Sequence, residues 1–262
     1  MPNYQYCDAL QTELSETGVL TATLNRPERL NAFDGELREA IYNMLADVRE
    51  DGDVRALVLT GAGRAFCSGA DLGAADQRKW PSRPHEPRFM WCVDLLEMPK
   101  PTIAAIHGAA AGGGLGLALL CDIRICSDRA RLIPIWNKRA IHPDDLVTWT
   151  LPRHVGYSRA LMWLYLAEDI PLDEAKSTGL VMDICSPEDL MPRAQALAEK
   201  LAAGPTLNYA LTKQAVLRGL IREPKDSAMI EVWGQNRASE SEDREEGVRA
   251  FRERRAPVFK GR

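Results

Sequence analysis

Long apolar runs are missing from the sequence, and so are paired cysteines. A membrane-spanning helix needs about 18 consecutive apolar residues, and the nearest match, residues 103–120, is interrupted by glycines. The six cysteines form no Cys-x-x-Cys motif and no cluster with the four histidines. This argues against a zinc site and against a disulfide framework. Scattered cysteines are typical of a protein that is kept in a reducing cytoplasm.

Neither sign of charge dominates. The chain has 33 Lys and Arg against 37 Asp and Glu, a net charge of −4, and no dense basic patch, so we expect no nucleic-acid partner. Its first residues, MPNYQYCDAL, match neither a signal peptide nor an Arg-rich transit sequence. We therefore expect a cytoplasmic location and no membrane attachment. With 262 residues, 45% of them hydrophobic, the chain can bury a sizeable core.

What is present is an alternation of strand and helix patterns. Asp34 is a favourable N-cap for a helix over 35–50, whose apolar residues recur at helical spacing. A buried strand, ALVLT, is predicted at 56–60. Such alternation indicates an α/β fold. Further strands are predicted at 5–13, 18–25, 102–107, 123–126 and 180–184, and further helices at 89–97, 143–168, 187–203, 206–220, 227–240 and 241–255.

The stretch PTIAAIHGAAAGGGLGLALLCD, residues 101–122, organises the chain. A buried strand leads to Gly112, Gly113 and Gly114, and an apolar helix follows. The start of a helix leaves backbone N–H groups unpaired and partly positive, and glycines let a substrate oxygen approach them. The pattern predicts an oxyanion hole, although close packing of a helix on a sheet would also explain the glycines.

A second loop of the same kind follows the strand at 56–60. Its sequence, Ser68-Gly69-Ala70-Asp71, offers backbone N–H groups after a buried strand, as the triple glycine does. Two donors from separate strands can converge on one carbonyl oxygen, and each is typically worth about 2.7–4 kcal/mol in stabilising an oxyanion. The two loops together are therefore a more specific signal than either loop alone.

Several longer segments resemble the crotonase (enoyl-CoA hydratase/isomerase) superfamily over nearly the whole chain. These segments are LNRPERLNAF (24–33), VRALVLTGAGRAFCSGADL (54–72), KPTIAAIHGAAAGGGLGLALLCDIRICSDRARL (100–132), VGYSRAL (155–161), DEAKSTGLV (173–181) and AFRERRAPVFKGR (250–262). The resemblance implies a spiral of ββα units with a C-terminal helical trimerisation domain, assembled as homotrimers or dimers of trimers. We assign residues 1–200 to the core and 201–262 to the helical oligomerisation region.

The resemblance also implies an enzyme of the enoyl-CoA hydratase/isomerase type. Its substrate would be an acyl-CoA thioester whose oxygen meets the N–H groups of Ala70 and Gly113, and no cofactor is expected besides the coenzyme A of the substrate. The residues at coenzyme A-holding positions of the family are Arg29, Leu30, Ala70, Asp71 and Leu72, and those at positions that reach the coenzyme A of a neighbouring subunit are Phe251 and Arg254.

The chain departs from a hydratase of this family at two positions. Such a hydratase acts on water with two glutamates, and the matching positions here are Gly116 and Trp136. Neither residue can transfer a proton, so hydration by paired glutamates is not expected. The titratable residues that remain nearby are His142, Asp144 and Asp145, all in segment 133–156.

Segment 133–156 is locally similar to the chlorobenzoyl-CoA dehalogenases, another group of crotonases. In those enzymes a tryptophan matches Trp136 and a nucleophilic aspartate matches Asp144. Their water-activating histidine would fall at Phe89, where this chain departs from the pattern. The similarity therefore favours chemistry based on Asp144 without fixing the reaction.

Three functional hypotheses stay open. Asp144 could serve as acid and base toward a thioester enolate, or it could attack as a nucleophile in an aryl-CoA dehalogenase or hydrolase. A chain without the glutamate pair could also bind acyl-CoA without catalysis. Asp144, and more readily Asp145, could instead cap the following helix, as Asp71 could cap a helix after its loop. Trp136 would line the acyl site or the core, and His142 would lie in a loop or assist an aspartate.

Overall fold

The protein is described by a computed structural model that covers residues 4–71, 73, 90–220 and 222–262. The strands in these ranges are β1 (Leu10–Leu14), β2 (Val19–Leu24), β3 (Ala56–Gly61), β4 (Ala65–Cys67), β5 (Thr102–Ile106), β6 (Ala109–Ala111), β7 (Ile123–Ser127), β8 (Arg131–Ile133) and β9 (Asp183–Cys185). The α-helices are α1 (Gly35–Glu50), α2 (Met90–Leu96), α3 (Gly113–Leu120), α4 (Val147–Val155), α5 (Tyr157–Leu166), α6 (Leu172–Ser177), α7 (Pro187–Ala202), α8 (Thr206–Gly219), α9 (Pro224–Ser239) and α10 (Glu242–Glu253).

From β3 onward, successive strands alternate between two sheets. The larger sheet has the order β1-β2-β3-β5-β7-β9 and is parallel except for the antiparallel pair β1 and β2, while the smaller parallel sheet has the order β4-β6-β8. In the larger sheet, β3, β5 and β7 are each followed in the chain by a short strand of the smaller sheet, namely β4, β6 and β8. This arrangement confirms the predicted α/β class and the spiral of ββα units.

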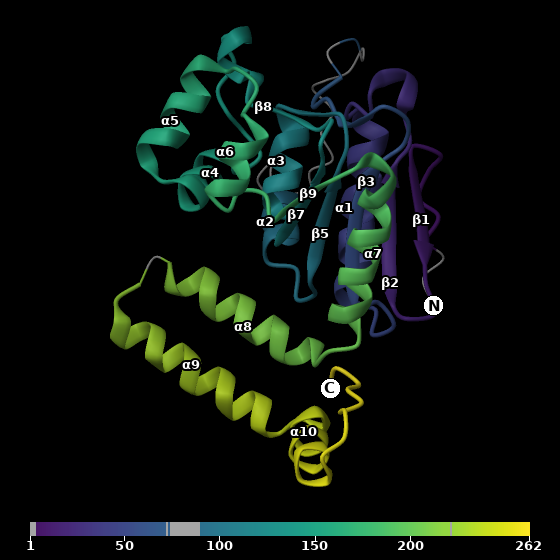
Figure 1. Cartoon of the computed structure of the whole chain (residues 1–262), viewed down its shortest axis with the longest axis vertical. Coiled ribbons are helices and arrows are strands. Elements are labelled where there is room, and N and C mark those ends of the chain that lie inside the picture. The colour runs from purple at the N-terminus through teal and green to yellow at the C-terminus, as the bar shows by residue number, and fades with distance from the viewer. Residues whose placement is uncertain (1–3, 72, 74–89, 221) are drawn as a thin grey trace.

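The larger sheet is buried on both faces because alternate residues of a strand point to opposite sides. In β3, Leu57 and Leu59 join the core cluster that contains α1 residues such as Met44, whereas Val58 packs with Ala194 of α7. Helices α1 and α7 therefore cover opposite faces of the sheet (Figure 1). The start of α1 is as predicted, because the Asp34 side chain accepts a hydrogen bond of 2.8 Å from the Leu37 N–H.

Several predicted boundaries were wrong. The smaller sheet was missed because its strands have only three residues each, too few to display a period of two. The helix expected over 143–168 is two helices that meet at Gly156, whose φ of 82° breaks the helical path. The strand expected at 5–13 begins at Leu10, and the strand expected at 180–184 begins at Asp183.

Helices α8, α9 and α10 extend away from the larger sheet, below it in Figure 1. Within the described ranges, no helix combines the length and the apolar character that crossing a membrane requires. The tail that follows α10 returns toward the core, where Arg55 donates hydrogen bonds to the carbonyl oxygens of Lys260 at 2.6 Å and of Gly204 at 2.8 Å. This contact joins the C-terminus to the end of α7.

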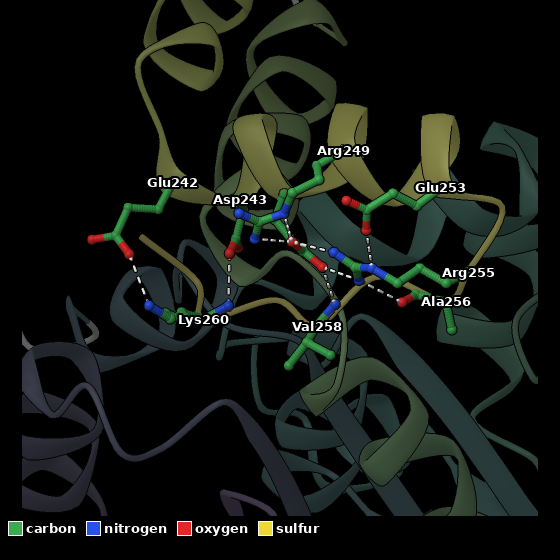
Figure 2. A network of polar contacts seen from close by, with 9 residues as sticks. Glu242, Asp243, Arg249, Glu253, Arg255, Ala256, Val258 and Lys260 are labelled. Atoms are coloured by element: carbon green, nitrogen blue, oxygen red, sulfur yellow. Dashed lines mark hydrogen bonds and ion pairs between the residues drawn. The ribbon is translucent and has the colours of Figure 1, made fainter.

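Two buried carboxylates on one face of α10 hold the tail in place. Asp243 accepts hydrogen bonds from the backbone N–H groups of Lys260 and Gly261, at 2.6 and 2.8 Å. Glu246 accepts from the Arg255 guanidinium and from the Val258 N–H, at 2.6 and 2.9 Å. Figure 2 shows this network, with Arg255 also reaching Glu253. Each carboxylate thus replaces hydrogen bonds that the tail backbone would otherwise make with water.

We predict that Glu246→Gln releases the tail. The amide keeps the shape of the side chain but loses the charge that the arginines and the Val258 N–H approach, so Tm should fall by about 3 °C. Chymotryptic cleavage after Phe259 should become faster. The matched control is Glu240→Gln, an exposed glutamate whose carboxylate lies 3.5 Å from Arg237. Equal cleavage rates in the two variants would contradict this account of the tail.

Candidate active site

The two glycine-bearing loops abut each other at the edge of the smaller sheet. A Cβ atom added to Gly69, which has a φ of 89°, would lie 2.7 Å from the carbonyl oxygen of Ala111 and 3.1 Å from the nitrogen of Gly113. A Cβ on Gly114 would lie 2.0 Å from the carbonyl oxygen of Cys67. Both positions therefore exclude any larger residue, and the loops meet backbone against backbone.

The hydrogen bonds around Ala70 orient its backbone. Phe33 donates to the carbonyl oxygen of Gly69 at 2.7 Å and accepts from the Asp71 N–H at 2.9 Å. Because successive peptide groups of an extended chain point to opposite sides, the N–H of Ala70 faces away from Phe33. Gly113 is the first residue of α3, and its N–H has no partner within the helix. These two residues carry the N–H groups that the sequence singled out.

Ala70 and Gly113 lie on the wall of one cavity of about 220 Å³. Asp144, Asp145 and Trp136 line the same cavity. The remaining lining residues are Arg38, Ser68, Gly69, Ala111, Gly112, Ile135, Arg139 and Ile141. Of these, Arg38, Ile135, Arg139 and Ile141 were not anticipated, because nothing in their local sequence distinguishes them from ordinary surface or core positions.

Trp136 fixes the direction of Asp144. The indole lies in the short 3-10 helix Ile135–Arg139 and is 4% exposed. Its Nε1–H donates a hydrogen bond of 2.8 Å to Oδ1 of Asp144. Because an indole nitrogen can only donate, this contact suits a carboxylate that is free to accept. Trp136 is thus both a core residue and part of the cavity wall.

Asp145 occupies the space that Gly116 and Gly113 leave open. A Cβ on Gly116 would lie 2.7 Å from the Cβ of Asp145, and a Cβ on Gly113 would lie 2.7 Å from its Oδ2. The side chain of Asp145 is buried, with the residue 4% exposed. A carboxyl group from the segment before α4 therefore lies directly against Gly113 and Gly116 of α3.

The capping role expected for Asp145 was wrong, and the capping alternative for Asp144 is also excluded. The N-cap of α4 is Leu146, whose apolar side chain cannot accept a hydrogen bond. The backbone carbonyl oxygen of Asp144, and not its carboxylate, accepts a hydrogen bond from the Val147 N–H in the first turn. Asp145 and Leu146 both have positive φ angles, 50° and 56°. This left-handed backbone turns the Asp145 side chain inward to α3 instead of along the axis of α4.

Burial raises the pKa of the Asp145 carboxyl to about 7. The negative charge of Asp144 contributes to this rise, and so does a hydrogen bond between the two side chains. The Arg38 guanidinium opposes the rise, as does the thiol of Cys92, whose Sγ is 3.7 Å from Oδ1 of Asp145. Near neutral pH, Asp145 therefore exchanges a proton readily.

The other candidate residues lie outside the cavity wall or outside the described ranges. His142 is exposed, with its Nδ1 2.6 Å from the carbonyl oxygen of Pro143, so the geometry gives its catalytic role no support. Leu72 and Phe89 are not among the described residues. Phe251, which is 85% exposed, and Arg254 lie at the end of α10.

The predicted coenzyme A positions adjoin the cavity on one side. The carbonyl oxygen of Leu30 accepts a hydrogen bond of 3.0 Å from the N–H of Ser68, a wall residue, and that of Arg29 lies 3.4 Å from the Ser68 hydroxyl. Asp71 pairs with Arg26 at 3.0 Å, and the helix that it was predicted to cap falls outside the described residues. The roles of these residues toward coenzyme A stay predictions.

Known proteins match this chain over most of its length. The family model for enoyl-CoA hydratase/isomerase matches residues 15–262. The 1,2-epoxyphenylacetyl-CoA isomerase of Escherichia coli (strain K12) is 38% identical, covering 94% of this chain and 97% of the relative. The 4-chlorobenzoyl coenzyme A dehalogenase-1 of an Arthrobacter species is 37% identical, covering 77% and 75%. The crystal structure of an enoyl-CoA hydratase from Bacillus anthracis is 32% identical, with a TM-score of 0.89, and covers 97% and 100%.

We predict that Asp145 makes the stability of the protein depend on pH. Its folded-state pKa of about 7 is above the value of about 3.9 for an unfolded aspartate. The stabilisation that the protonated Asp145 gives the folded protein is therefore fully present below about pH 4 and is lost as the pH rises to about 7. The loss in the free energy of unfolding is at most about 4 kcal/mol. The free energy of unfolding, measured in urea, should fall over this range relative to that of Asp145→Asn, which does not ionise. A constant difference between the two proteins would contradict the assignment.

Proposed function

The chain belongs to the enoyl-CoA hydratase/isomerase family of acyl-CoA enzymes, and we propose that it stabilises a thioester enolate with Asp144 as acid and base. The observation that carries the proposal is one cavity that contains Ala70, Gly113 and Asp144 on its wall. A thioester oxygen between the two backbone N–H groups would gain about 2.7–4 kcal/mol from each donor as negative charge develops. Such an oxygen would place the acyl carbons against Asp144.

The Trp136–Asp144 contact supports proton transfer by Asp144. A general base must be held within reach of the proton that it removes, and the indole N–H limits the directions in which the carboxylate can turn. In the proposed reaction the carboxylate of Asp144, held in this direction, would receive a proton from a C–H group of the acyl chain. Because Gly116 and Trp136 replace the glutamates of a hydratase, the proposed reaction is proton transfer on carbon, as in an isomerisation, and not the addition of water by a glutamate pair.

A second candidate is an aryl-CoA dehalogenase or hydrolase. The similarity to the chlorobenzoyl coenzyme A dehalogenase favours it, together with the tryptophan that donates to the aspartate. In this route an oxygen of Asp144 would form a bond to a ring carbon, the halide would leave with its bonding electrons, and water would then hydrolyse the ester. The flat faces of Trp136 would suit an aromatic acyl group. A non-catalytic acyl-CoA binder is the third alternative.

We also propose that the chain assembles as a homotrimer or as a dimer of trimers. Met229, Val232 and Trp233 lie on one face of α9 and are 63%, 53% and 52% exposed. A monomer would leave this apolar face in water. Phe251 and Arg254 would then reach the coenzyme A of a neighbouring subunit, while Arg29, Leu30, Ala70 and Asp71 would hold that of their own. The six free thiols suit the predicted cytoplasmic location.

We predict that Asp144→Asn lowers turnover by about 100-fold or more, since a positioned general base contributes roughly 10²- to 10⁴-fold. Binding of CoA thioesters, measured by calorimetry, should be retained. The assay should compare crotonyl-CoA, vinylacetyl-CoA, phenylacetyl-CoA and a chlorobenzoyl-CoA. The matched control is Asp169→Asn, whose exposed carboxylate pairs with Arg131 at 2.6 Å.

The same assay separates the three hypotheses. Deuterium incorporation from D₂O into the acyl chain selects proton transfer, and an ester on Asp144 detected by mass spectrometry selects the nucleophilic route. Tight binding without either signal across all four thioesters selects the binder. Full turnover by Asp144→Asn would show that Asp144 is not the acting group.

A further prediction concerns Trp136→Phe, which removes the indole N–H and keeps an aromatic ring. Loss of a hydrogen bond to a charged group is worth about 1.5–3 kcal/mol, so kcat should fall by roughly 10- to 100-fold while the Kd for the thioester stays the same. The control is Trp149→Phe, because Trp149 packs under the Arg153 guanidinium at 3.9 Å and does not line the cavity. Equal kcat values in the two variants would argue against positioning by Trp136.

A further inference from the structure

The cavity wall contains two neighbouring carboxyl groups, although the proposed function uses only Asp144. Asp145 lies against α3, with its Cβ 2.7 Å from the Cβ position of Gly116 and its Oδ2 2.7 Å from that of Gly113. Gly116 is the position at which a hydratase of this family has a glutamate. In this chain a carboxyl group also lies beside α3, but it is attached to the segment before α4.

The position of Asp145 constrains its charge. Its Oδ2 lies against Gly113, whose N–H is one of the two proposed oxyanion donors. An ionised carboxylate there would repel the negative charge of an enolate, and the burial of Asp145, which is 4% exposed, strengthens the repulsion. A neutral carboxylic acid in the same place carries no such penalty and has a proton to give. The geometry therefore favours the protonated form of Asp145 during the reaction.

The groups that face Asp145 come from four elements. Asp144 belongs to the same segment, Arg38 comes from α1, Cys92 comes from α2 and Cys67 comes from β4. Arg38 is the cation among these groups, and it lines the cavity as both aspartates do. Burial raises the pKa of both thiols, so neither cysteine supplies charge near neutral pH. Arg139 also lines the cavity but is exposed, whereas Arg38 is the cation that lowers the pKa of Asp145. This arrangement suits one negative charge on the aspartate pair better than two.

We propose that Asp145 is a second catalytic residue, a carboxylic acid that delivers a proton to the acyl chain while Asp144 removes one. The inference rests on the proposed function, because it takes Asp144 as the base. In the conversion of vinylacetyl-CoA to crotonyl-CoA, Asp144 takes a proton from the α-carbon and the electron pair of that C–H bond enters the enolate. Asp145 then gives its proton to the γ-carbon and forms the new C–H bond. Transfer of the proton from Asp144 to Asp145 returns both groups to their starting states.

The variant Asp145→Asn separates a catalytic role from a structural one. Asparagine keeps the size, the neutral charge and the hydrogen-bond donor of a protonated aspartate, but it does not release a proton at the γ-carbon. We expect formation of crotonyl-CoA from vinylacetyl-CoA to fall by about 100-fold or more. Exchange of the α-hydrogen in D₂O and the Kd should stay as in the unmodified protein. Asp169→Asn is the matched control.

A second measurement does not depend on activity and is made first on the unmodified protein. Carbon NMR of the protein labelled at its aspartate carboxyl carbons should reveal one carboxyl group that titrates near neutral pH. Its signal should be absent from Asp145→Asn and should titrate at lower pH in Asp144→Asn, where the neighbouring charge is gone. If every aspartate carboxyl signal of the unmodified protein has the chemical shift of an ionised carboxylate at neutral pH, the proposal is wrong.

The remaining outcomes are also decisive. If the variant Asp145→Asn forms crotonyl-CoA at the rate of the unmodified protein, Asp145 is not the acid. If the unmodified protein does not convert vinylacetyl-CoA, the proposed proton donation by Asp145 is also wrong. Full turnover by Asp144→Asn would instead overturn the proposed function. The carboxyl group of Asp145 could still titrate near neutral pH in that case. Failure of the further inference and failure of the proposed function are therefore distinguishable.

Discussion

The contact between two backbone loops sets the geometry of the cavity. Gly69 lies so close to Ala111 and Gly113 that a single Cβ atom would force the loops apart. This contact depends on the smaller sheet, in which β4 pairs with β6 through Ala65 with Ala109 and Cys67 with Ala110. A register shift in this pair would move Ala70 relative to Gly113. Three short strands therefore determine whether two N–H groups can act on one oxygen.

The second constraint concerns where the carboxyl groups are attached. A glutamate on α3 would need space that Asp145 already fills, because the Cβ positions of Gly116 and Asp145 are only 2.7 Å apart. A glutamate at position 116 and an inward-facing Asp145 therefore exclude each other. The glycine at 116 is what allows the side chain of Asp145 to turn inward. The left-handed backbone at Asp145 and Leu146 costs conformational energy, which is tolerated where the surrounding packing holds it in place.

Sequence patterns predicted the elements whose signals are local and long. The helix that begins after Asp34 has both a cap and an apolar period over sixteen residues, and the family motifs predicted the spiral fold. The smaller sheet and the buried position of Asp145 were not predictable in this way. The first has strands too short to display a period, and the second depends on a contact between residues 145 and 116 that no local pattern records. An aspartate before a helix usually caps it, and here the tertiary contact outweighs that preference.

The chemistry of the cavity depends on which of the two carboxyl groups, Asp144 or Asp145, accepts a hydrogen bond from the stronger donor. The indole N–H of Trp136 serves Asp144 at 2.8 Å, whereas Asp145 has the weaker thiol donor of Cys92 at 3.7 Å and is more deeply buried. A shared negative charge is therefore better accommodated on Asp144, the group that would face the acyl chain in the proposed function. The proposed enolate at Gly113 would add a second negative charge to the same wall. Holding the carboxyl group nearest Gly113 neutral leaves the two backbone donors free to act on the enolate alone.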